Sequence, residues 1–230
     1  MMRLVYNSLL ILLIGVGVGC SQTISDDETV SDYMIEHREA ITSLVVPEQE
    51  SSNKKVIYAR KVITRQMIET AGIPLMFVEK RNGQNWTLAL FPGENIQETW
   101  IGGGGATLSL HNGELVATRG FGDDLMGTSV LKSKAFIERL DASYTKKIRY
   151  LTPDNKNDDH NLRCKMVKSK EKEIIEVFEL KHTVSKYSES CVIEERIITN
   201  EFWQDSAGIT IMSKQFHSDT VGYLLIMKLK

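Results

Sequence analysis

The chain has 230 residues, of which 42% are hydrophobic and 25% are charged, and its formal net charge is -2. A charge balance this close to neutral argues against nucleic acid as a partner, because nucleic acid needs a concentrated basic face. A chain of this length can bury an adequate core as one larger domain or two small ones, and nothing in its composition requires a split.

The first twenty residues have the parts of a secretory signal peptide. A cationic start ends at Arg3, residues 9–19 form an apolar run, and Cys20 follows at once. The run is too short for a hydrocarbon core about 30 Å thick, which takes roughly twenty helical residues. The small residues at 17–19 resemble the lipobox of bacterial lipoproteins, in which the cysteine carries lipid and becomes the N-terminus. The alternative is an ordinary secretory signal cut elsewhere, with Cys20 unmodified.

These features predict three segments: a signal peptide over 1–19, a lipid-anchored tether over 20–50 and a single β-rich periplasmic domain over 51–230. Acyl chains on Cys20, palmitate among them, form a stable anchor when two or more are present. Ser21 stands where an Asp would resemble the signal for inner-membrane retention, so we expect the outer membrane. Ser25 and Glu28 fit a capping box for a short helix in the tether.

The next signals along the chain are a second short helix and two hairpins. Thr64 is a suitable cap for a helix over residues 65–71, which would stop at Gly72. Asn82-Gly83 and Asn112-Gly113 each predict a two-residue type I′ turn between alternating strands. The implied registers pair Phe77 with Leu88 in the first hairpin, and Leu110 with Leu115, His111 with Glu114 and Leu108 with Ala117 in the second.

Beyond residue 143 the chain is rich in β-branched and aromatic residues between turn-forming residues. The polar stretch 153–161 is expected to be an exposed loop. Counted with the hairpins, about ten strands and one or two short helices predict an antiparallel β-sandwich or a curled barrel-like sheet. The strands expected here span residues 144–151, 162–168, 173–180, 191–199, 209–216 and 221–229.

Two cysteines remain if Cys20 is lipidated. An even pair in an oxidising compartment favours a disulfide between Cys164 and Cys191, linking two neighbouring strands with Cα atoms about 4.4 to 6.8 Å apart. Free buried thiols are the alternative. His160 and His182 stand nearby in the sequence, but their spacing is not that of a zinc site, so we expect no metal.

Candidate catalytic groups are sparse. Four glycines at 102–105 lack the Lys-Ser or Lys-Thr and the helix of a phosphate-binding loop, so a flexible turn is expected there and no cofactor. Asp123 and Asp124, with Glu114 and Arg119 close in sequence, are candidates for the carboxylate pair of a glycosidase. Adjacent strand residues point to opposite faces, so solvated loop residues or a helix cap at Asp124 is the simpler interpretation.

Three tryptophans are candidates for contact with sugar rings, because an aromatic face packs well against pyranose C–H groups. They are Trp86, Trp100 and Trp203, and core packing is the alternative for each. The five histidines have no metal spacing, and no nucleophile motif is visible.

Two blocks of the sequence resemble a known family. Residues 97–125 contain Trp100, the Asn112-Gly113 turn, Leu115-Val116 and Thr118-Arg119-Gly120-Phe121, followed by Asp124-Leu125. Residues 199–215 contain Asn200-Glu201-Phe202-Trp203-Gln204-Asp205, then Gly208 and Ser213-Lys214-Gln215. Both blocks, with the short helix after Ile63, are similar to the YjbF/GfcB family of lipoproteins from group 4 capsule and exopolysaccharide operons.

The resemblance implies an outer-membrane lipoprotein that faces the periplasm and takes part in polysaccharide assembly or export. It implies no agreed active site. Our leading hypothesis is therefore a non-catalytic accessory protein that contacts the polysaccharide or another secretion protein. The alternatives are a glycan-modifying enzyme using the loop carboxylates, and a periplasmic carrier of lipid or glycan. The residues proposed for glycan or partner contact are Trp100, Arg119, Asp123, Asp124 and Trp203.

Overall fold

The computed structural model describes residues 63–92, 97–129, 142–151 and 156–230. The predicted signal peptide, Cys20 and the predicted tether helix lie outside these described residues.

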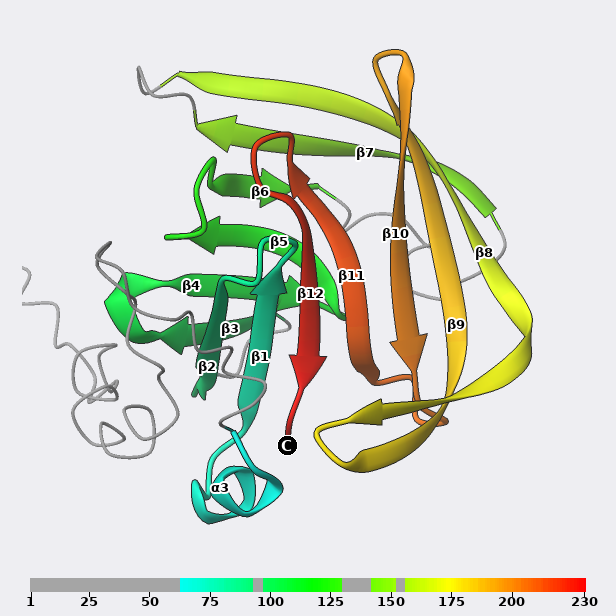
Figure 1. Ribbon diagram of the computed structural model, residues 1–230. Coiled ribbons are helices and arrows are strands. Elements are labelled where there is room, and N and C mark those ends of the chain that lie inside the picture. Colours follow the sequence, from blue (N-terminus) through cyan, green and yellow to red (C-terminus); the bar gives the residue numbers. More distant parts are fainter. Residues whose placement is uncertain (1–62, 93–96, 130–141, 152–155) are drawn as a thin grey trace, which may run out of the picture.

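The described residues form one 12-stranded antiparallel sheet that curls into a nearly closed barrel (Figure 1). The strand order is β5-β4-β3-β2-β1-β12-β11-β10-β9-β8-β7-β6, so strands consecutive in the chain, β5 and β6, stand at its two ends. The barrel-like alternative is thus confirmed. The strands are β1 (Leu75–Lys80), β2 (Asn85–Phe91), β3 (Gln97–Gly102), β4 (Thr107–His111), β5 (Glu114–Arg119), β6 (Leu125–Thr128), β7 (Ala142–Leu151), β8 (Asn157–Val177), β9 (Leu180–Ile193), β10 (Arg196–Gln204), β11 (Thr210–Ser218) and β12 (Gly222–Lys228).

Several boundaries differ from the sequence prediction. The expected strand 191–199 contains the β9–β10 turn, where Glu194 has a positive φ of 54°. The loop expected over 153–161 is wrong for residues 157–161, which belong to strand β8. Asp159 of this strand lies opposite Arg149 of β7. Cross-strand ion pairs let polar residues occupy a strand that has one solvated face.

The first hairpin has a different register from the predicted one. Leu88 lies opposite Met76, and Phe77 lies opposite Thr87. Only Gly83 of the Asn82-Gly83 pair has a positive φ, and Lys80 N donates to Gln84 O at 2.8 Å. This three-residue loop, of the kind that combines a type I turn with a left-handed glycine, shifts the pairing by one residue. The side chains of one strand therefore change face relative to those of the other, and Phe77 and Leu88 lie on opposite faces.

The second hairpin has the predicted type I′ turn. Asn112 and Gly113 have φ values of 50° and 81°, and Leu110 lies opposite Leu115 as expected. A register shift beyond Leu110 then places Leu108 opposite Thr118 instead of Ala117. An extra residue on one strand of a pair produces such a β-bulge and increases the local twist.

Successive side chains of a strand point to opposite faces of the sheet, and this separates two apolar clusters. The barrel interior contains the larger cluster, with Met76, Val78, Leu88 and Ile226 among its members. Phe77 belongs to a second cluster, on the other face of β1.

The second cluster is covered by two elements. Helix α3 (Arg65–Thr70) begins at Thr64, whose hydroxyl accepts from Met67 N at 3.3 Å, as predicted, and it packs Ile68 into the cluster. The far end of the β8–β9 hairpin curls back towards β1 and β12 (Figure 1) and brings Phe178 within 5.3 Å of Phe77, between ring centroids. Fully burying a phenylalanine contributes about 1.5 to 3 kcal/mol to folding.

The predicted disulfide is present. Cys164 of β8 and Cys191 of β9 lie directly opposite each other, and their sulfurs are bonded. Their Cα atoms are 4.0 Å apart, which is slightly closer than the expected range. The closer type of opposite pair in antiparallel strands has Cα atoms about 4.5 Å apart, so a bridge between opposite residues lies at the short end of the disulfide range.

Candidate functional site

The two ends of the sheet meet at the turn between β5 and β6, where the predicted carboxylates lie. Leu125 N donates to Thr118 Oγ1 at 3.0 Å, and Arg119 Nη1 donates to Leu125 O at 3.2 Å. No backbone ladder joins β5 and β6 among the described residues. The hydrogen bond that the Thr118 hydroxyl accepts and the one that the Arg119 guanidinium donates therefore help to hold the barrel closed at this point.

Asp124 organises the same turn. Its carboxylate accepts from Gly120 N at 2.8 Å, from Phe121 N at 3.1 Å and from the Thr118 hydroxyl at 3.1 Å. Asp123 accepts from Ser218 Oγ at 3.2 Å. Asp124 precedes strand β6, so the helix cap suggested by the sequence is wrong. The Asp124 carboxylate therefore stabilises the turn through these hydrogen bonds. A carboxylate engaged in this way is poorly placed to exchange protons with a substrate.

A buried histidine adjoins this turn and was missed by sequence reasoning. His217 of β11 is fully buried, and its Nε2 lies 2.9 Å from Thr118 Oγ1. Burial lowers the pKa of His217 to about 4, more than the nearby Asp124 carboxylate raises it. The neutral imidazole is therefore the form present at neutral pH, where it acts as a hydrogen-bonding partner inside the barrel.

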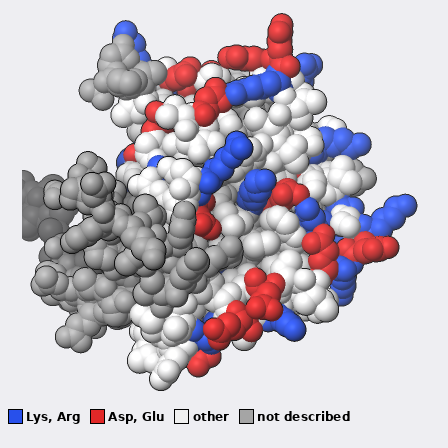
Figure 2. Space-filling model, viewed as in Figure 1, with Lys and Arg blue, Asp and Glu red and all other residues white. Residues whose placement is uncertain are grey.

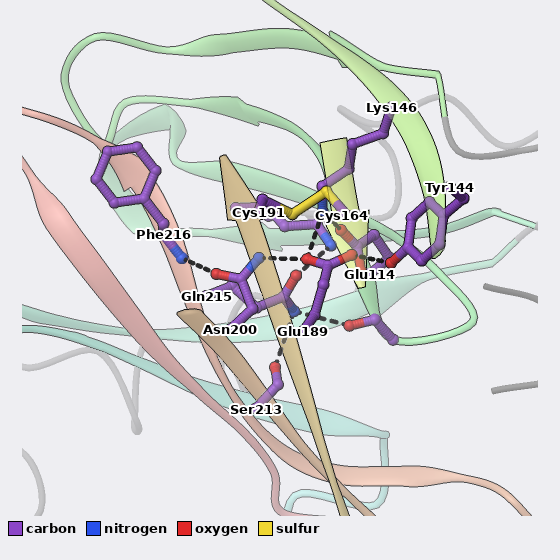
Figure 3. A network of polar contacts seen from close by, with 12 residues as sticks. Glu114, Tyr144, Lys146, Cys164, Glu189, Cys191, Asn200, Ser213, Gln215 and Phe216 are labelled. Atoms are coloured by element: carbon purple, nitrogen blue, oxygen red, sulfur yellow. Dashed lines mark hydrogen bonds and ion pairs between the residues drawn. A yellow bond between two sulfur atoms is a disulfide. The ribbon is translucent and has the colours of Figure 1, made fainter. Parts of the chain in front are cut away.

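A charged cluster lies inside the barrel, between β5, β7 and β9 (Figure 3). Lys146 Nζ donates to Glu114 Oε1 at 2.7 Å and to Glu189 Oε2 at 2.6 Å. The side chains of these three residues are at most 3% exposed. Taking charges out of water costs several kcal/mol for each ion, and the mutual attraction offsets this only when geometry is good.

The charges of this cluster stabilise one another. Burial by itself lowers the pKa of Lys146, but the two carboxylates outweigh burial and hold its pKa above the ordinary value. Burial by itself raises the pKa of Glu189, but the Lys146 ammonium together with the hydrogen bonds from Tyr144 and Asn200 outweighs burial and holds its pKa below the ordinary value. Lys146 and Glu189 are thus both charged at neutral pH.

Neutral side chains extend the cluster to further strands. Asn200 Nδ2 donates to Glu189 Oε2 at 2.6 Å, and the Tyr144 hydroxyl donates to Glu189 Oε1. Gln215 of β11 donates to Gly113 O and accepts from Leu115 N, both at 2.8 Å. The Asn112-Gly113 turn is therefore tied across the barrel interior to the C-terminal strands.

The sequence contains a signal that could have located this cluster. Lys146 alternates with Tyr144 and Ile148, and Glu189 alternates with Tyr187 and Cys191. In a strand with one buried face, a charged residue in the apolar register is predicted to be buried. Its partner on another strand is a tertiary contact, which local sequence cannot identify.

A cavity of about 20 Å³ adjoins the cluster and is lined by Glu114, Lys146, Asn200 and Gln215, among others. A cavity must exceed about 10 to 15 Å³ to hold one water molecule. This cavity is therefore the size of a single water and is far too small for an acyl chain or a sugar.

One group of possible metal ligands lies beside the cluster. The sulfurs of Cys164 and Cys191 and a carboxylate oxygen of Glu189 lie within 4.8 Å of one another. The two sulfurs are bonded to each other, so they do not offer the thiolates that bind zinc.

Of the three tryptophans proposed for sugar contact, Trp100 and Trp203 are buried, and Trp86 is half-buried with its ring centroid 4.5 Å from that of Phe121. Trp100 is 1% exposed, and its Nε1 donates to Glu98 Oε2 at 3.2 Å. Trp203 is 8% exposed and donates to Glu173 of the curled β8–β9 hairpin at 3.2 Å, with Lys186 above its ring. Neither ring offers a face to a sugar, so both follow the core-packing alternative. Of the other proposed contact residues, Arg119 and Asp123 are exposed and Asp124 is half-buried.

The surface is mixed in charge. Figure 2 shows lysines and arginines interleaved with carboxylates over the face seen in Figure 1. Within the part of the chain that the structure describes, no helix has the length and apolar character needed to span a membrane.

The sequence matches the model of a known family over most of its length. Residues 41–229 match the model of a family described as group 4 capsule polysaccharide lipoprotein gfcB, YjbF. The chain belongs to this family. The match confirms the assignment that rested on residues 97–125 and 199–215. The family is one of lipoproteins, which implies attachment to a membrane, and its description associates it with capsule polysaccharide.

A solved structure has a similar fold. It is the crystal structure of the hypothetical lipoprotein YmcC from Escherichia coli (K12), with a TM-score of 0.65 and 20% sequence identity. The similarity covers 78% of this chain and 98% of that one. At this identity the likeness shows the fold alone. No curated protein matches the sequence.

Proposed function

We propose that this chain is an outer-membrane lipoprotein that acts, without catalysis, in the assembly or export of a capsule polysaccharide or exopolysaccharide. Membership of the group 4 capsule lipoprotein family, over residues 41–229, carries the proposal. Residues 1–19 are the signal peptide and 20–50 the tether. Acylated Cys20 holds the domain of residues 51–230 at the periplasmic face.

The placement of the carboxylates supports a non-catalytic role. Glu114 is 2% exposed and paired with Lys146, while Asp124 holds the β5–β6 turn. General acid or base catalysis needs a carboxyl group within reach of a bound substrate. The alternative of a glycan-modifying enzyme at these residues gains no support from their geometry.

The size of the interior supports an accessory protein over a carrier. The cavity beside Lys146 holds about one water molecule, and the rest of that neighbourhood is packed with apolar side chains. We therefore propose that polysaccharide or a secretion protein is contacted at the outer surface of the barrel.

The anchor is tested by changing Cys20 to Ala and fractionating the cells. We expect Cys20→Ala to release the protein from the outer membrane and to reduce polysaccharide at the cell surface. Ser21→Asp is the matched variant, since it retains the lipid and should move the protein to the inner membrane. If Cys20→Ala still fractionates with the outer membrane as the wild type does, the anchor is wrong.

The non-catalytic role is tested with Asp123→Asn and Asp124→Asn at protein levels equal to wild type. Removing a catalytic acid or base typically costs 10²- to 10⁴-fold in rate. We expect surface polysaccharide to stay within about twofold of wild type, well short of such a loss. A collapse of export at normal abundance would favour the enzyme instead.

A further inference from the structure

We propose that the outer face of β7, β8 and β9 binds an acidic polysaccharide chain. This inference rests on the proposed function, because it names the class of partner that an accessory protein of a polysaccharide pathway would hold. The surface, called the basic face below, consists of Thr145, Lys147, Arg149, Asp159, Asn161, Arg163, Lys165 and Ser190.

These side chains point away from the barrel interior. Lys146, Cys164 and Cys191 are buried in the interior, and successive residues of a strand point to opposite faces. The register confirms that the outward residues are neighbours across the strands: Thr145 lies opposite Arg163, and Lys165 lies opposite Ser190.

The basic face carries four basic residues and one acidic residue. Asp159 is shared by Lys147 Nζ, at 2.6 Å, and Arg149 Nε, at 2.6 Å. Arg163 and Lys165 are exposed and form no ion pair within the described part of the chain. The basic face therefore has a net positive charge although the whole chain is close to neutral, and this favours an anionic partner.

The other members of the face are suited to sugars. Thr145, Asn161 and Ser190 supply hydroxyl and amide groups, which can both donate and accept hydrogen bonds with sugar hydroxyls. Apolar side chains adjoin the basic face singly: Val192 lies opposite Arg163, and Val167, which is 41% exposed, follows Lys165 on the same side of β8. Binding to a lipid surface draws on a large buried apolar area as well as charge. Single valines among charged and polar side chains do not supply such an area, so the composition favours a hydrated, acidic sugar chain over a membrane.

The geometry gives the cations a regular spacing. Arg163 and Lys165 stand two residues apart on β8, which places their Cα atoms about 7 Å apart along the strand. Lys147 lies opposite Asn161, next to Arg163 on the same face. An extended polyanion lying along β8 would thus meet several cations in succession.

The test uses the full mature chain purified in detergent and a polyuronate, alginate, as the probe. Binding is measured at low salt and at physiological salt, with neutral dextran and anionic phosphatidylglycerol vesicles in parallel. We expect alginate to bind at low salt and to be released by salt, because interactions at exposed charges are screened. Dextran should not bind measurably.

The deciding variants change charge at matched positions. Arg163→Gln/Lys165→Gln should weaken alginate binding about fivefold or more, as expected for two exposed charge pairs. Lys170→Gln/Lys172→Gln removes the same charge from exposed residues of β8 outside the basic face and should bind within twofold of wild type.

Three results would overturn the proposal: no alginate binding by the wild type, equal weakening in the two double variants, or tighter binding to the vesicles than to alginate. Failure of the proposed function shows itself separately, as unchanged surface polysaccharide in cells that lack the protein.

Discussion

Lys146 of β7 donates to Glu114 of β5 at 2.7 Å, and this contact joins two strands that are not neighbours in the sheet. Glu114 follows the Asn112-Gly113 turn, and Lys146 also pairs with Glu189 of β9. The ion pair therefore links the N-terminal hairpins with the C-terminal strands through the inside of the barrel. No backbone hydrogen bonds join β5 to β6 among the described strands. Side-chain contacts across the barrel interior therefore help to position the two ends of the sheet relative to each other.

Lys146→Met should destabilise the protein strongly, by about 3 to 5 kcal/mol, because it leaves two carboxylates buried without their cation. The control is Lys147→Met on the same strand, where the side chain faces outward and is 43% exposed. Its change should stay within about 1 kcal/mol. Urea unfolding of the three proteins measures the difference. Equal destabilisation by both substitutions would contradict the role given to the buried cluster.

Stability should fall as pH falls from about 6.5 to about 4, because burial lowers the pKa of His217 to about 4. In this window the unfolded chain binds a proton that the folded chain does not, so acid favours unfolding. The full effect is about 3 kcal/mol. It is present above pH 6.5 and lost as pH drops through the folded-state pKa.

His217→Gln tests this assignment, since glutamine keeps a hydrogen-bonding side chain and does not titrate. Unfolding free energies are measured between pH 7 and pH 5, above the range in which Glu189 contributes. The variant should lose most of the pH dependence that the wild type shows there. A slope identical to that of the wild type would assign the dependence to other groups.

Reduction of the Cys164–Cys191 disulfide should lower the free energy of unfolding by about 3 to 4 kcal/mol, if the bridge acts by restricting the unfolded chain. The two cysteines are 27 positions apart. The double variant Cys164→Ala/Cys191→Ala is the control, since its unfolding should be the same with and without reductant. If the unfolding midpoint of the wild-type protein were the same with and without reductant, the disulfide would add no stability.

Gly113→Ala should be destabilising for two reasons. Its φ of 81° disfavours a side chain, and an added Cβ would come within 2.5 Å of Thr210 Cβ. Gly208→Ala is the matched control, with a φ of 83° and nothing within 4 Å of the added atom. Positive φ alone costs about 1 to 2 kcal/mol. Thermal unfolding should show Gly113→Ala to be the more destabilised, and equal shifts would exclude the clash with Thr210.

Several features could be predicted from short stretches of the sequence alone. Thr64 marks the helix start, Asn112-Gly113 makes its type I′ turn, and Cys164 pairs with Cys191. Cap and turn signals depend on the backbone φ of a few neighbouring residues, and the even pair of cysteines that remains after Cys20 left one intramolecular pairing to predict.

Register and burial depended on contacts between distant residues. The loop at Gly83 shifted its hairpin by one residue and sent Phe77 outward, where α3 and Phe178 cover it. Trp203 is buried because the β8–β9 hairpin curls back, and Trp203 donates to Glu173 of that hairpin. The pairing of Lys146 with Glu114 and Glu189 requires three strands to meet, and the cost of burying those charges is offset only once the barrel has formed.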